Sequence, residues 1–309
     1  MSGTHVHILM GAYNGAPHLP DQLRSIAAQT HADWSLTCSD DSSDNGSTRA
    51  VIEAFGASVP QAVTVVSGPE QGFSANFMQM IRDLPEAAET VALADQDDRW
   101  LPDKLSRAQA ALAAAAPEVP TLYCAQVLYW WPDRDVTRQG PARPRPPRFE
   151  NALIENIAQG NTIALNPAAA ALARRASART GAVFAHDWWL YLLVLGAGGR
   201  VIFDSEPALF YRQHGDNAIG AGQGIAAQIG RKRAVLKGAY AARIDSNIAA
   251  LRAVDDLLTP QTRATLERFA RARKQSLIRR ISAFWRLGLY RQGGLSSLTF
   301  WGGAVLGRV

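Results

Sequence analysis

The sequence alternates, over residues 5–116, between short apolar runs and segments whose apolar residues recur at helical spacing. Strands are predicted for the apolar runs, at residues 5–12, 34–38, 63–66 and 91–94. Helices are predicted between and after them, at residues 19–29, 48–55, 74–84 and 102–116. This alternation is typical of an α/β fold with a mainly parallel, doubly wound sheet. Because such sheets bind ligands beyond the carboxyl ends of their strands, we expect functional residues just after each predicted strand.

Residues 131–148 interrupt this pattern with five prolines and five arginines. They predict a mobile loop, and the sequence leaves open whether it is an inert surface excursion or a lid over a site. Beyond the loop, strands are predicted near residues 161–165, 200–203 and 208–211, with helices beginning at residues 167 and 187. From about residue 225 the chain is predicted to be helical.

Charge divides the chain into two parts. Residues 226–309 contain 16 Lys and Arg but only four Asp and Glu, a net charge of +12, whereas residues 1–225 carry −7. We therefore predict two domains, at residues 1–225 and 226–309. The acidic part is suited to holding a cation, and the basic part to an anionic surface.

Composition narrows the class of protein and its location. Hydrophobic residues make up 47% of the chain and charged residues 19%, which excludes a disordered chain. Two cysteines, Cys38 and Cys124, exclude a disulfide framework and a structural zinc site. The first residues do not resemble a secretory signal, and the longest apolar run, 188–198, is too short to span a bilayer. The sequence therefore predicts a cytoplasmic protein.

Three carboxylates, Asp95, Asp97 and Asp98, follow the predicted strand at residues 91–94. Like charges at a strand end repel each other unless water or a cation neutralises them. Carboxylates two residues apart suit Mg²⁺ or Mn²⁺, which keep open positions for substrate phosphates. The alternative is an acidic turn before a helix that begins near Pro102, and spacing alone favours neither interpretation.

A second acidic cluster follows the predicted strand at residues 34–38 and includes Asp40, Asp41 and Asp44. Its Asp, Asn, Gly and Ser residues predict a turn, and Asp44 or Ser47 is a candidate cap for the next helix. Capping explains only part of the cluster. Two groups of carboxylates at one sheet edge fit a site where one group binds a nucleobase or ribose and the other holds a metal on the diphosphate.

Two further segments contain chemically active residues. Asp187 opens an apolar helix, so its local sequence favours a helix N-cap over a catalytic role. His214 by itself is typical of a surface histidine rather than a metal ligand.

The order of these motifs resembles family 2 glycosyltransferases of the GT-A fold, and is similar in particular to bacterial rhamnosyltransferase-like members. The resemblance covers about residues 5–220. The matching motifs are Gly11-Ala-Tyr-Asn-Gly15, Gln22 to Thr30, Asp40-Asp-Ser-Ser-Asp44, Gln71-Gly-Phe-Ser-Ala-Asn-Phe77, Asp95-Gln-Asp-Asp98 with Trp100 to Leu105, His186-Asp-Trp-Trp189, and Tyr211-Arg-Gln-His214 with Asn217.

The resemblance implies a nucleotide-sugar pocket at the first of these motifs. Tyr13 and Asn14 would line it, Asp41 would bind a uracil- or thymine-type base, and Asn76 and Asp95 would also contact the nucleotide sugar. The implied fold is a Rossmann-like GT-A domain, typical of nucleotide-diphospho-sugar transferases, with a basic, mainly helical C-terminal extension.

The resemblance also implies which residues bind the metal and which residue is the catalytic base. Asp95 and Asp97 form the Asp-x-Asp motif for Mg²⁺ or Mn²⁺, with Asp97 as the direct ligand and His214 as a further contact to the metal or diphosphate. Asp187 matches the catalytic base, which deprotonates the acceptor hydroxyl in an inverting reaction.

The implied reaction moves one sugar, L-rhamnose by similarity to the rhamnosyltransferase-like members, from a dTDP- or UDP-linked donor. The implied acceptor is a hydroxyl of a lipid-linked precursor of O-antigen, capsule or exopolysaccharide. A nucleotidyltransferase is an alternative, but its glycine-rich loop is absent from residues 11–15. A non-catalytic nucleotide-sugar-binding protein on the same scaffold is another. Nothing in the sequence indicates a nucleic-acid partner.

The basic C-terminal residues contain an amphipathic pattern. Leu277, Ile278, Ile281, Phe284 and Trp285 follow the spacing of one helical face, and basic residues border it at Arg273, Lys274, Arg279, Arg280 and Arg286. One interpretation is a helix packed on the catalytic domain with solvated arginines. The other is a peripheral, non-spanning anchor on the anionic inner face of the cytoplasmic membrane, from about Arg268 onward.

Overall fold

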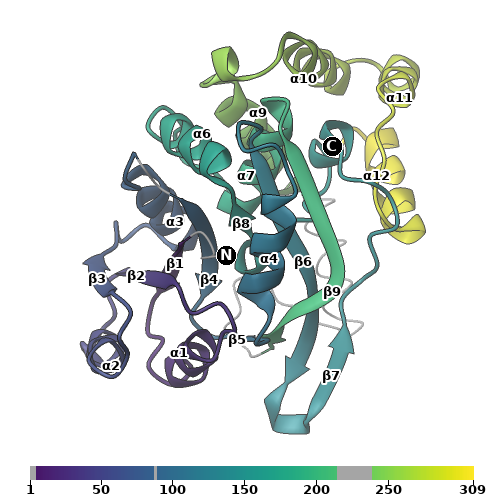
Figure 1. Ribbon diagram of the computed structural model, residues 1–309. Coiled ribbons are helices and arrows are strands. Elements are labelled where there is room, and N and C mark those ends of the chain that lie inside the picture. Colours follow the sequence, from purple (N-terminus) through teal and green to yellow (C-terminus); the bar gives the residue numbers. More distant parts are fainter. Residues whose placement is uncertain (1–4, 87–88, 214–238) are drawn as a thin grey trace.

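The computed structural model describes residues 5–86, 89–213 and 239–309 (Figure 1). The strands are β1 (Val6–Ala12), β2 (Trp34–Asp40), β3 (Val63–Ser67), β4 (Thr90–Asp95), β5 (Arg99–Trp100), β6 (Thr121–Trp131), β7 (Val136–Gln139), β8 (Ala164–Leu165) and β9 (Arg200–Arg212). The helices are α1 (Leu19–Ala27), α2 (Ser47–Gly56), α3 (Phe73–Arg82), α4 (Lys104–Ala113), α5 (Phe149–Ala152), α6 (Pro167–Ser177), α7 (His186–Gly196), α9 (Ala239–Arg252), α10 (Pro260–Arg273), α11 (Leu277–Arg286) and α12 (Gly294–Val305). The alternation predicted for residues 5–116 is confirmed.

The strands form one sheet in the order β3-β2-β1-β4-β8-β6-β9-β5, and β7 pairs with the outer part of β6. The first four strands are parallel, as predicted, and β6 and β9 are also parallel. The prediction of a mainly parallel sheet was wrong for the second half, because the short strands β5, β7 and β8 pair antiparallel with their neighbours. The sheet is therefore mixed.

Two features of the second half differ from the prediction. The long strand β6 was not predicted, and the strands predicted near residues 200–203 and 208–211 are one strand, β9, with a register shift against β6. Residues 131–148 are not all loop, because β7 forms a hairpin with the end of β6. Asp135, in the left-handed conformation with φ of 48°, ends the turn between them.

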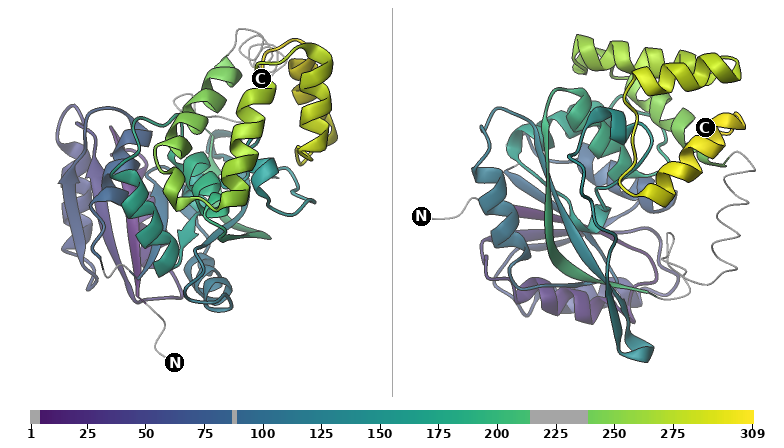
Figure 2. Two further views of the ribbon diagram at one scale, coloured as in Figure 1. Left: turned by 90° about the horizontal axis from the view of Figure 1, so that it is seen from above. Right: turned by 90° about the vertical axis from the view of Figure 1, so that its right-hand side faces the viewer.

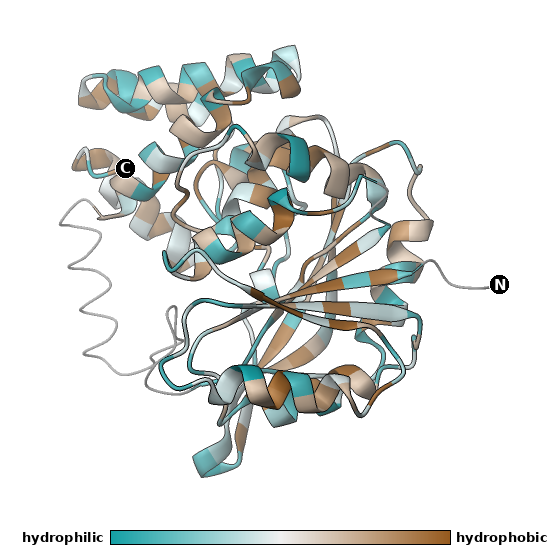
Figure 3. Ribbon diagram, turned by 90° about the vertical axis from the view of Figure 1, so that its left-hand side faces the viewer, coloured by the Kyte–Doolittle hydropathy of each residue, from teal (hydrophilic) through white to brown (hydrophobic). Residues whose placement is uncertain are grey.

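Each face of the sheet has its own hydrophobic core. Ile8 and Met10 of β1 belong to a buried cluster with Leu19 and Leu23 of α1, whereas Leu9 belongs to the cluster that contains α3, α6 and α7. This division follows from the alternation of side chains along a strand. Figure 3 shows the hydrophobic strands lying between helices.

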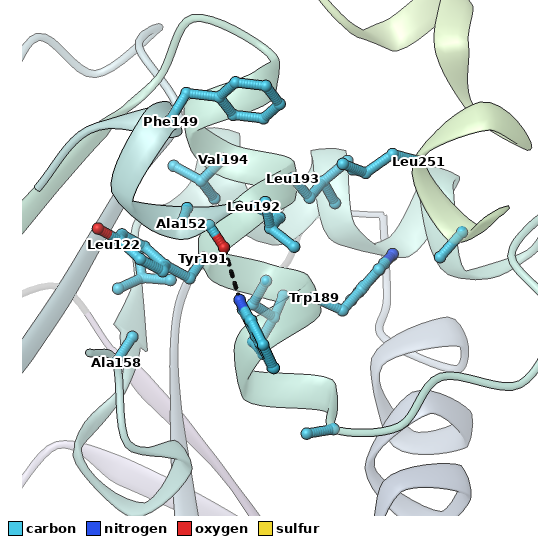
Figure 4. Close-up of a cluster of buried hydrophobic side chains, with 14 of the residues drawn as sticks. Leu122, Phe149, Ala152, Ala158, Trp189, Tyr191, Leu192, Leu193, Val194 and Leu251 are labelled. Carbon is cyan, nitrogen blue, oxygen red and sulfur yellow. Dashed lines mark hydrogen bonds between the residues drawn. The ribbon is translucent and has the colours of Figure 1, made fainter. Parts of the chain in front are cut away.

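Helix α7 is buried along almost its whole length and joins the sheet to the C-terminal helices. In Figure 4 its side chains Leu192, Leu193 and Val194 lie among Phe149 of α5 and Leu251 of α9, all within one cluster. The Trp188 indole N–H donates to the Ala152 carbonyl at 2.7 Å. The hydrophobic core on this face of the sheet therefore continues into the C-terminal helices.

The predicted basic C-terminal extension is helical, and α9 to α12 lie together at one end of the molecule (Figure 2). Polar contacts also hold it in place. The Asn151 amide donates to the carbonyl of Tyr290 at 2.9 Å, and the buried Glu155 carboxylate accepts from the backbone N–H of Gln292 at 2.7 Å. The predicted boundary at residue 225 lies outside the described residues. None of the helices in the described ranges is long and apolar enough to cross a bilayer.

Candidate active site

The carboxyl ends of β1, β2 and β4 bring three of the motifs to one edge of the sheet. In the strand register, Gly11 lies beside both Ser39 and Asp95, and Ala12 lies beside Asp40. The Asp41 backbone N–H also donates to the Ala12 carbonyl at 2.8 Å. The two acidic clusters predicted to share an edge therefore lie on either side of the segment that follows β1.

Tyr13 and Asn14 are held in place by the two neighbouring loops. Gln96 accepts from the Tyr13 backbone N–H at 2.9 Å and donates to the Tyr13 carbonyl at 2.8 Å, which leaves the ring exposed. The Asn14 amide donates to Asp44 at 2.7 Å. Asp44 therefore fixes Asn14 and does not cap α2, whose N-cap is Gly46 without a side-chain hydrogen bond.

Asp41 shapes the wall of this region. Its buried carboxylate accepts from the backbone N–H groups of Glu70 at 2.6 Å and Gly72 at 2.9 Å. Each carboxylate oxygen has a second lone pair, so Asp41 retains acceptor capacity for a ligand N–H. Asn76 is buried and donates to the Ser39 carbonyl at 2.9 Å, and its own amide oxygen has no hydrogen-bond partner among the described residues.

Gly68 gives the first testable prediction. A Cβ at this position would lie 2.9 Å from the Asp41 Cα and 3.0 Å from the Asn76 amide oxygen. Because the backbone of Asp41 has to shift, we expect Gly68→Ala to destabilise the fold by about 1–3 kcal/mol and to weaken binding of dTDP, one of the nucleotides that the sequence motifs predict. Thermal unfolding and dTDP titration measure these two effects. Gly181→Ala is the control, since its Cβ meets no atom within 4 Å. Equal dTDP affinity in both variants would contradict the expectation from the sequence that Asp41 binds the nucleobase.

The residues after β4 form a desolvated group of acids. Burial, together with the charges of Asp97 and Asp187, raises the pKa of Asp95 to about 7. Burial and its acidic neighbours also raise the pKa of Asp98 well above its ordinary range. Asp98 accepts from the Asn161 amide at 2.6 Å, but its other oxygen has no hydrogen-bond partner among the described residues. The carboxylates therefore lie close enough to interact, in a place where negative charge is costly.

Lys104 lies fully buried beneath this group. Its ammonium nitrogen donates to the Asn161 carbonyl at 2.7 Å and lies 3.2 Å from the centre of the Trp100 ring. Burial lowers the pKa of Lys104, while Asp98 and Asp95 raise it in opposition. The net effect is a pKa well below the ordinary value for lysine, so burial outweighs the attraction of the acids.

The oxygen donors here fit a hard divalent cation. Asp95 and Asp97 offer carboxylate oxygens, and their mutual repulsion is the condition that a cation relieves. Among the described residues, no group of three or more His, Cys, Asp or Glu side chains is arranged to hold a metal. Mg²⁺ commonly takes only one or two protein carboxylates and completes its coordination with water and substrate phosphates. His214, the third predicted ligand, lies outside the described residues.

Asp187 lies at the start of α7, and the interpretation of this residue as an N-cap was wrong. The N-cap is Ala185, because the helix begins one residue before Asp187, at His186. The Asp187 carboxylate accepts from the backbone N–H groups of Trp188 at 2.6 Å and Gly160 at 3.2 Å. Burial raises its pKa to about 6, although these bonds and one from the Asn156 side chain lower it.

His186, directly before Asp187, packs against an aromatic ring. Its ring is buried, stacks on Phe77 at a centroid distance of 4.1 Å, and has no hydrogen-bond partner at either nitrogen among the described residues. Burial lowers its pKa to about 3, so the ring is neutral at physiological pH. His186 thus fixes the entry into α7 next to Asp187.

Several residues of this region were not predicted from the sequence. Gln96, Asn156 and Asn161 position Tyr13, Asp187 and Asp98 respectively. Gln96 and Lys104 carried a signal, because they lie in the motifs Asp95 to Asp98 and Trp100 to Leu105, whereas nothing in the local sequence marks Asn156 or Asn161.

Comparisons with known proteins identify the family. Residues 7–179 match the protein family described as Glycosyl transferase family 2. A curated relative, the dTDP-rhamnosyl transferase RfbG of Shigella flexneri, is 26% identical over 227 residues, which are 69% of this chain and 74% of the relative.

Two solved structures show the same fold. The mannosyltransferase PcManGT from Pyrobaculum calidifontis, in complex with GDP-Man and Mn²⁺, has a TM-score of 0.53 at 19% identity and covers 99% of this chain and 86% of its own. Residues 1–349 of S. aureus TarS, in complex with UDP-GlcNAc, have a TM-score of 0.54 at 14% identity, with 93% of each chain covered. The predicted GT-A fold is confirmed.

Proposed function

Because this chain belongs to glycosyl transferase family 2, and is therefore a glycosyltransferase, we propose that it transfers one L-rhamnose from a dTDP-linked donor to a saccharide hydroxyl. The similarity to the dTDP-rhamnosyl transferase RfbG supports both the sugar and the nucleotide. The observation that carries the proposal is the buried Asp187 carboxylate beside the acids that follow β4.

Asp187 is the proposed catalytic base. A base has to be deprotonated before it takes the acceptor proton, and a pKa of about 6 leaves Asp187 mostly ionised at neutral pH while keeping it a better base than an exposed aspartate. Two backbone N–H donors hold the carboxylate in one orientation. Attack from the face opposite the diphosphate then inverts the anomeric carbon, and no covalent sugar–enzyme intermediate is needed.

The donor is proposed to lie along the carboxyl edge of β1, β2 and β4. Tyr13 and Asn14 would line the nucleotide pocket, Asp41 would accept from the base N–H, and Asn76 would contribute its amide oxygen. Asp97, assisted by Asp95, would hold Mg²⁺ or Mn²⁺. When bound, that cation stabilises the negative charge that develops on the leaving diphosphate. The Mn²⁺ in the PcManGT complex supports this assignment.

The proposed acceptor is a lipid-linked precursor of O-antigen, capsule or exopolysaccharide. An acceptor on a lipid is met at a membrane surface, so we place the enzyme in the cytoplasm, on the inner face of the cytoplasmic membrane. We also retain the division into a transfer domain, residues 1–225, and a membrane-associated region, residues 226–309.

Release of nucleoside diphosphate tests this proposal. The full chain is incubated with Mn²⁺ and dTDP-L-rhamnose, UDP-glucose or GDP-mannose, with and without a lipid extract as the acceptor source. Of the three donors, we expect only dTDP-L-rhamnose to release its nucleoside diphosphate. The lipid extract should increase the rate of this dTDP release. Binding of the donor without any release would favour a non-catalytic protein, and release from a different donor would overturn the assignment of rhamnose.

A further inference from the structure

Helices α11 and α12 carry several strongly exposed hydrophobic side chains. On α11, Ile278 is 82% exposed and Trp285 is 77% exposed. On α12, Leu295 is 78% and Leu298 70% exposed, and further along Leu306 is 62% exposed. These are among the largest exposures of hydrophobic residues in the described chain. An apolar area of this kind marks an interaction site.

The two helices share one apolar groove. It has a volume of about 650 Å³ and is lined by Leu277, Ile278, Ile281, Ser282 and Trp285 of α11 and by Trp301 and Val305 of α12. We call this groove, together with the exposed residues Leu295 and Leu298 of α12 and Leu306 directly after it, the α11–α12 surface. The sequence pattern predicted only the part on α11.

The opposite sides of these helices hold them to the protein. Phe284 of α11 is buried between Phe269 of α10 and Phe300 of α12, with ring centroids 5.5 and 5.9 Å away. Arg280 donates to the carbonyl oxygens of Ala304 at 2.7 Å and Val305 at 3.3 Å, at the end of α12. The α11–α12 surface is therefore part of a fixed structure.

Basic residues flank the apolar side chains. Arg279 and Arg286 are exposed and lie about two turns apart on the same side of α11, and neither forms an ion pair with any residue in the described ranges. Lys274 and Arg308 are exposed at the ends of the two helices. By contrast, Arg273 forms an ion pair with Asp245, and Arg280 donates to a carbonyl of α12. These two residues, which the sequence placed at the border of the apolar face, are therefore structural. No acidic residue follows Glu267 in the chain.

We propose that the α11–α12 surface inserts into the interface of an anionic lipid bilayer, with its leucines and Trp285 among the acyl chains and Arg279 and Arg286 at the headgroups. Exposed apolar side chains flanked by unpaired cations match the two layers of a bilayer surface. A second copy of the chain is a poorer occupant, because a symmetric interface would gather the flanking arginines of both copies, and no acidic residue follows Glu267 to pair with them. This inference rests on the proposed function, which already places residues 226–309 at the membrane. It adds which residues contact the lipid and that the binding is mainly apolar.

Co-sedimentation of the full chain with lipid vesicles tests the inference. The vesicles are phosphatidylcholine alone or phosphatidylcholine with phosphatidylglycerol, at low and high salt, without donor or acceptor. We expect binding to the mixed vesicles that weakens with salt but persists in part, because apolar insertion is not screened. Leu295→Ser with Leu298→Ser should lower the partition coefficient by at least about tenfold, while Arg279→Gln with Arg286→Gln should remove the dependence on phosphatidylglycerol.

Val136→Ser is the matched control, because Val136 is an exposed apolar residue of the β6–β7 hairpin and should bind as the wild type does. Equal vesicle binding by the wild type and the double leucine variant would overturn the inference. So would a stable dimer that the leucine substitutions dissociate while vesicles bind neither form. Co-sedimentation does not measure sugar transfer. A lack of vesicle binding would therefore leave the proposed reaction untouched, and a lack of sugar transfer would leave the vesicle-binding result unchanged.

Discussion

Replacing Asp97 with alanine is expected to abolish metal-dependent sugar transfer while leaving the protein folded. The carboxylate of Asp97 is half-buried and raises the pKa of both Asp95 and Asp98 through its charge. A cation that stabilises the leaving diphosphate is worth several kcal/mol, so losing its ligand should slow turnover more than about a hundredfold. Release of dTDP at saturating Mn²⁺ or Mg²⁺ measures this effect.

The fold should not suffer from the Asp97→Ala substitution, because one of three repelling charges is removed. The carbonyl of residue 97, which accepts from Arg212 at 2.9 Å, is retained. Circular dichroism and thermal unfolding should therefore match the wild type. Asp133→Ala, at the tip of the β6–β7 hairpin, is the control and should keep full activity. Near-wild-type turnover by Asp97→Ala at saturating metal would remove Asp97 from the metal site.

Replacing Asp187 with asparagine is expected to lower kcat by at least about a hundredfold with little change in donor affinity. A positioned general base contributes about 10²–10⁴ in rate, and asparagine cannot accept the acceptor proton. The amide keeps one oxygen for a backbone N–H but not two, so a loss of about 1 kcal/mol of stability is expected from the second bond. Unchanged kcat would leave Asp187 with a structural role only.

The pH dependence of kcat distinguishes these roles further. Because burial raises the pKa of Asp187 to about 6, the ionised base is depleted as the pH falls below that value. The wild-type kcat should therefore rise with pH up to about 6 and then level off. The remaining kcat of the Asp187→Asn variant should not show this rise with pH. A wild-type profile that is flat from pH 5 to 8 would contradict a base with this pKa.

The parallel half of the sheet was predictable because its signals are local. Each strand there is an apolar run, followed by a helix with its own periodicity. Strand β6 was missed although its sequence, Thr121 to Trp131, is rich in the aromatic and β-branched residues that are typical of strands. The β6–β7 hairpin was missed because its turn contains no glycine, the residue that usually signals such a turn. Asp135 takes the left-handed conformation instead.

The candidate site divides in the same way. Asp41, Asp95 and Asp97 were predictable because parallel strands bring their carboxyl ends to one edge. Their environment was not, since it depends on contacts between distant segments, such as the bond from Asn161 to Asp98, 63 residues apart. The interpretation of Asp187 as a cap was wrong because the backbone of His186 is already helical, which the local sequence does not reveal.

The continuous core around α7 decides how enzymes of this kind can be recombined. An exchange of the C-terminal region at residue 225 would separate Leu251 from Leu193, and Tyr290 and Gln292 from Asn151 and Glu155. A chimaera made at that point would combine two parts of one hydrophobic cluster from different proteins, and their side chains would not fit together. The misfit would lie next to α7, which carries the proposed base Asp187. A graft that keeps its activity has to carry α5 and α7 together with the helices that follow them.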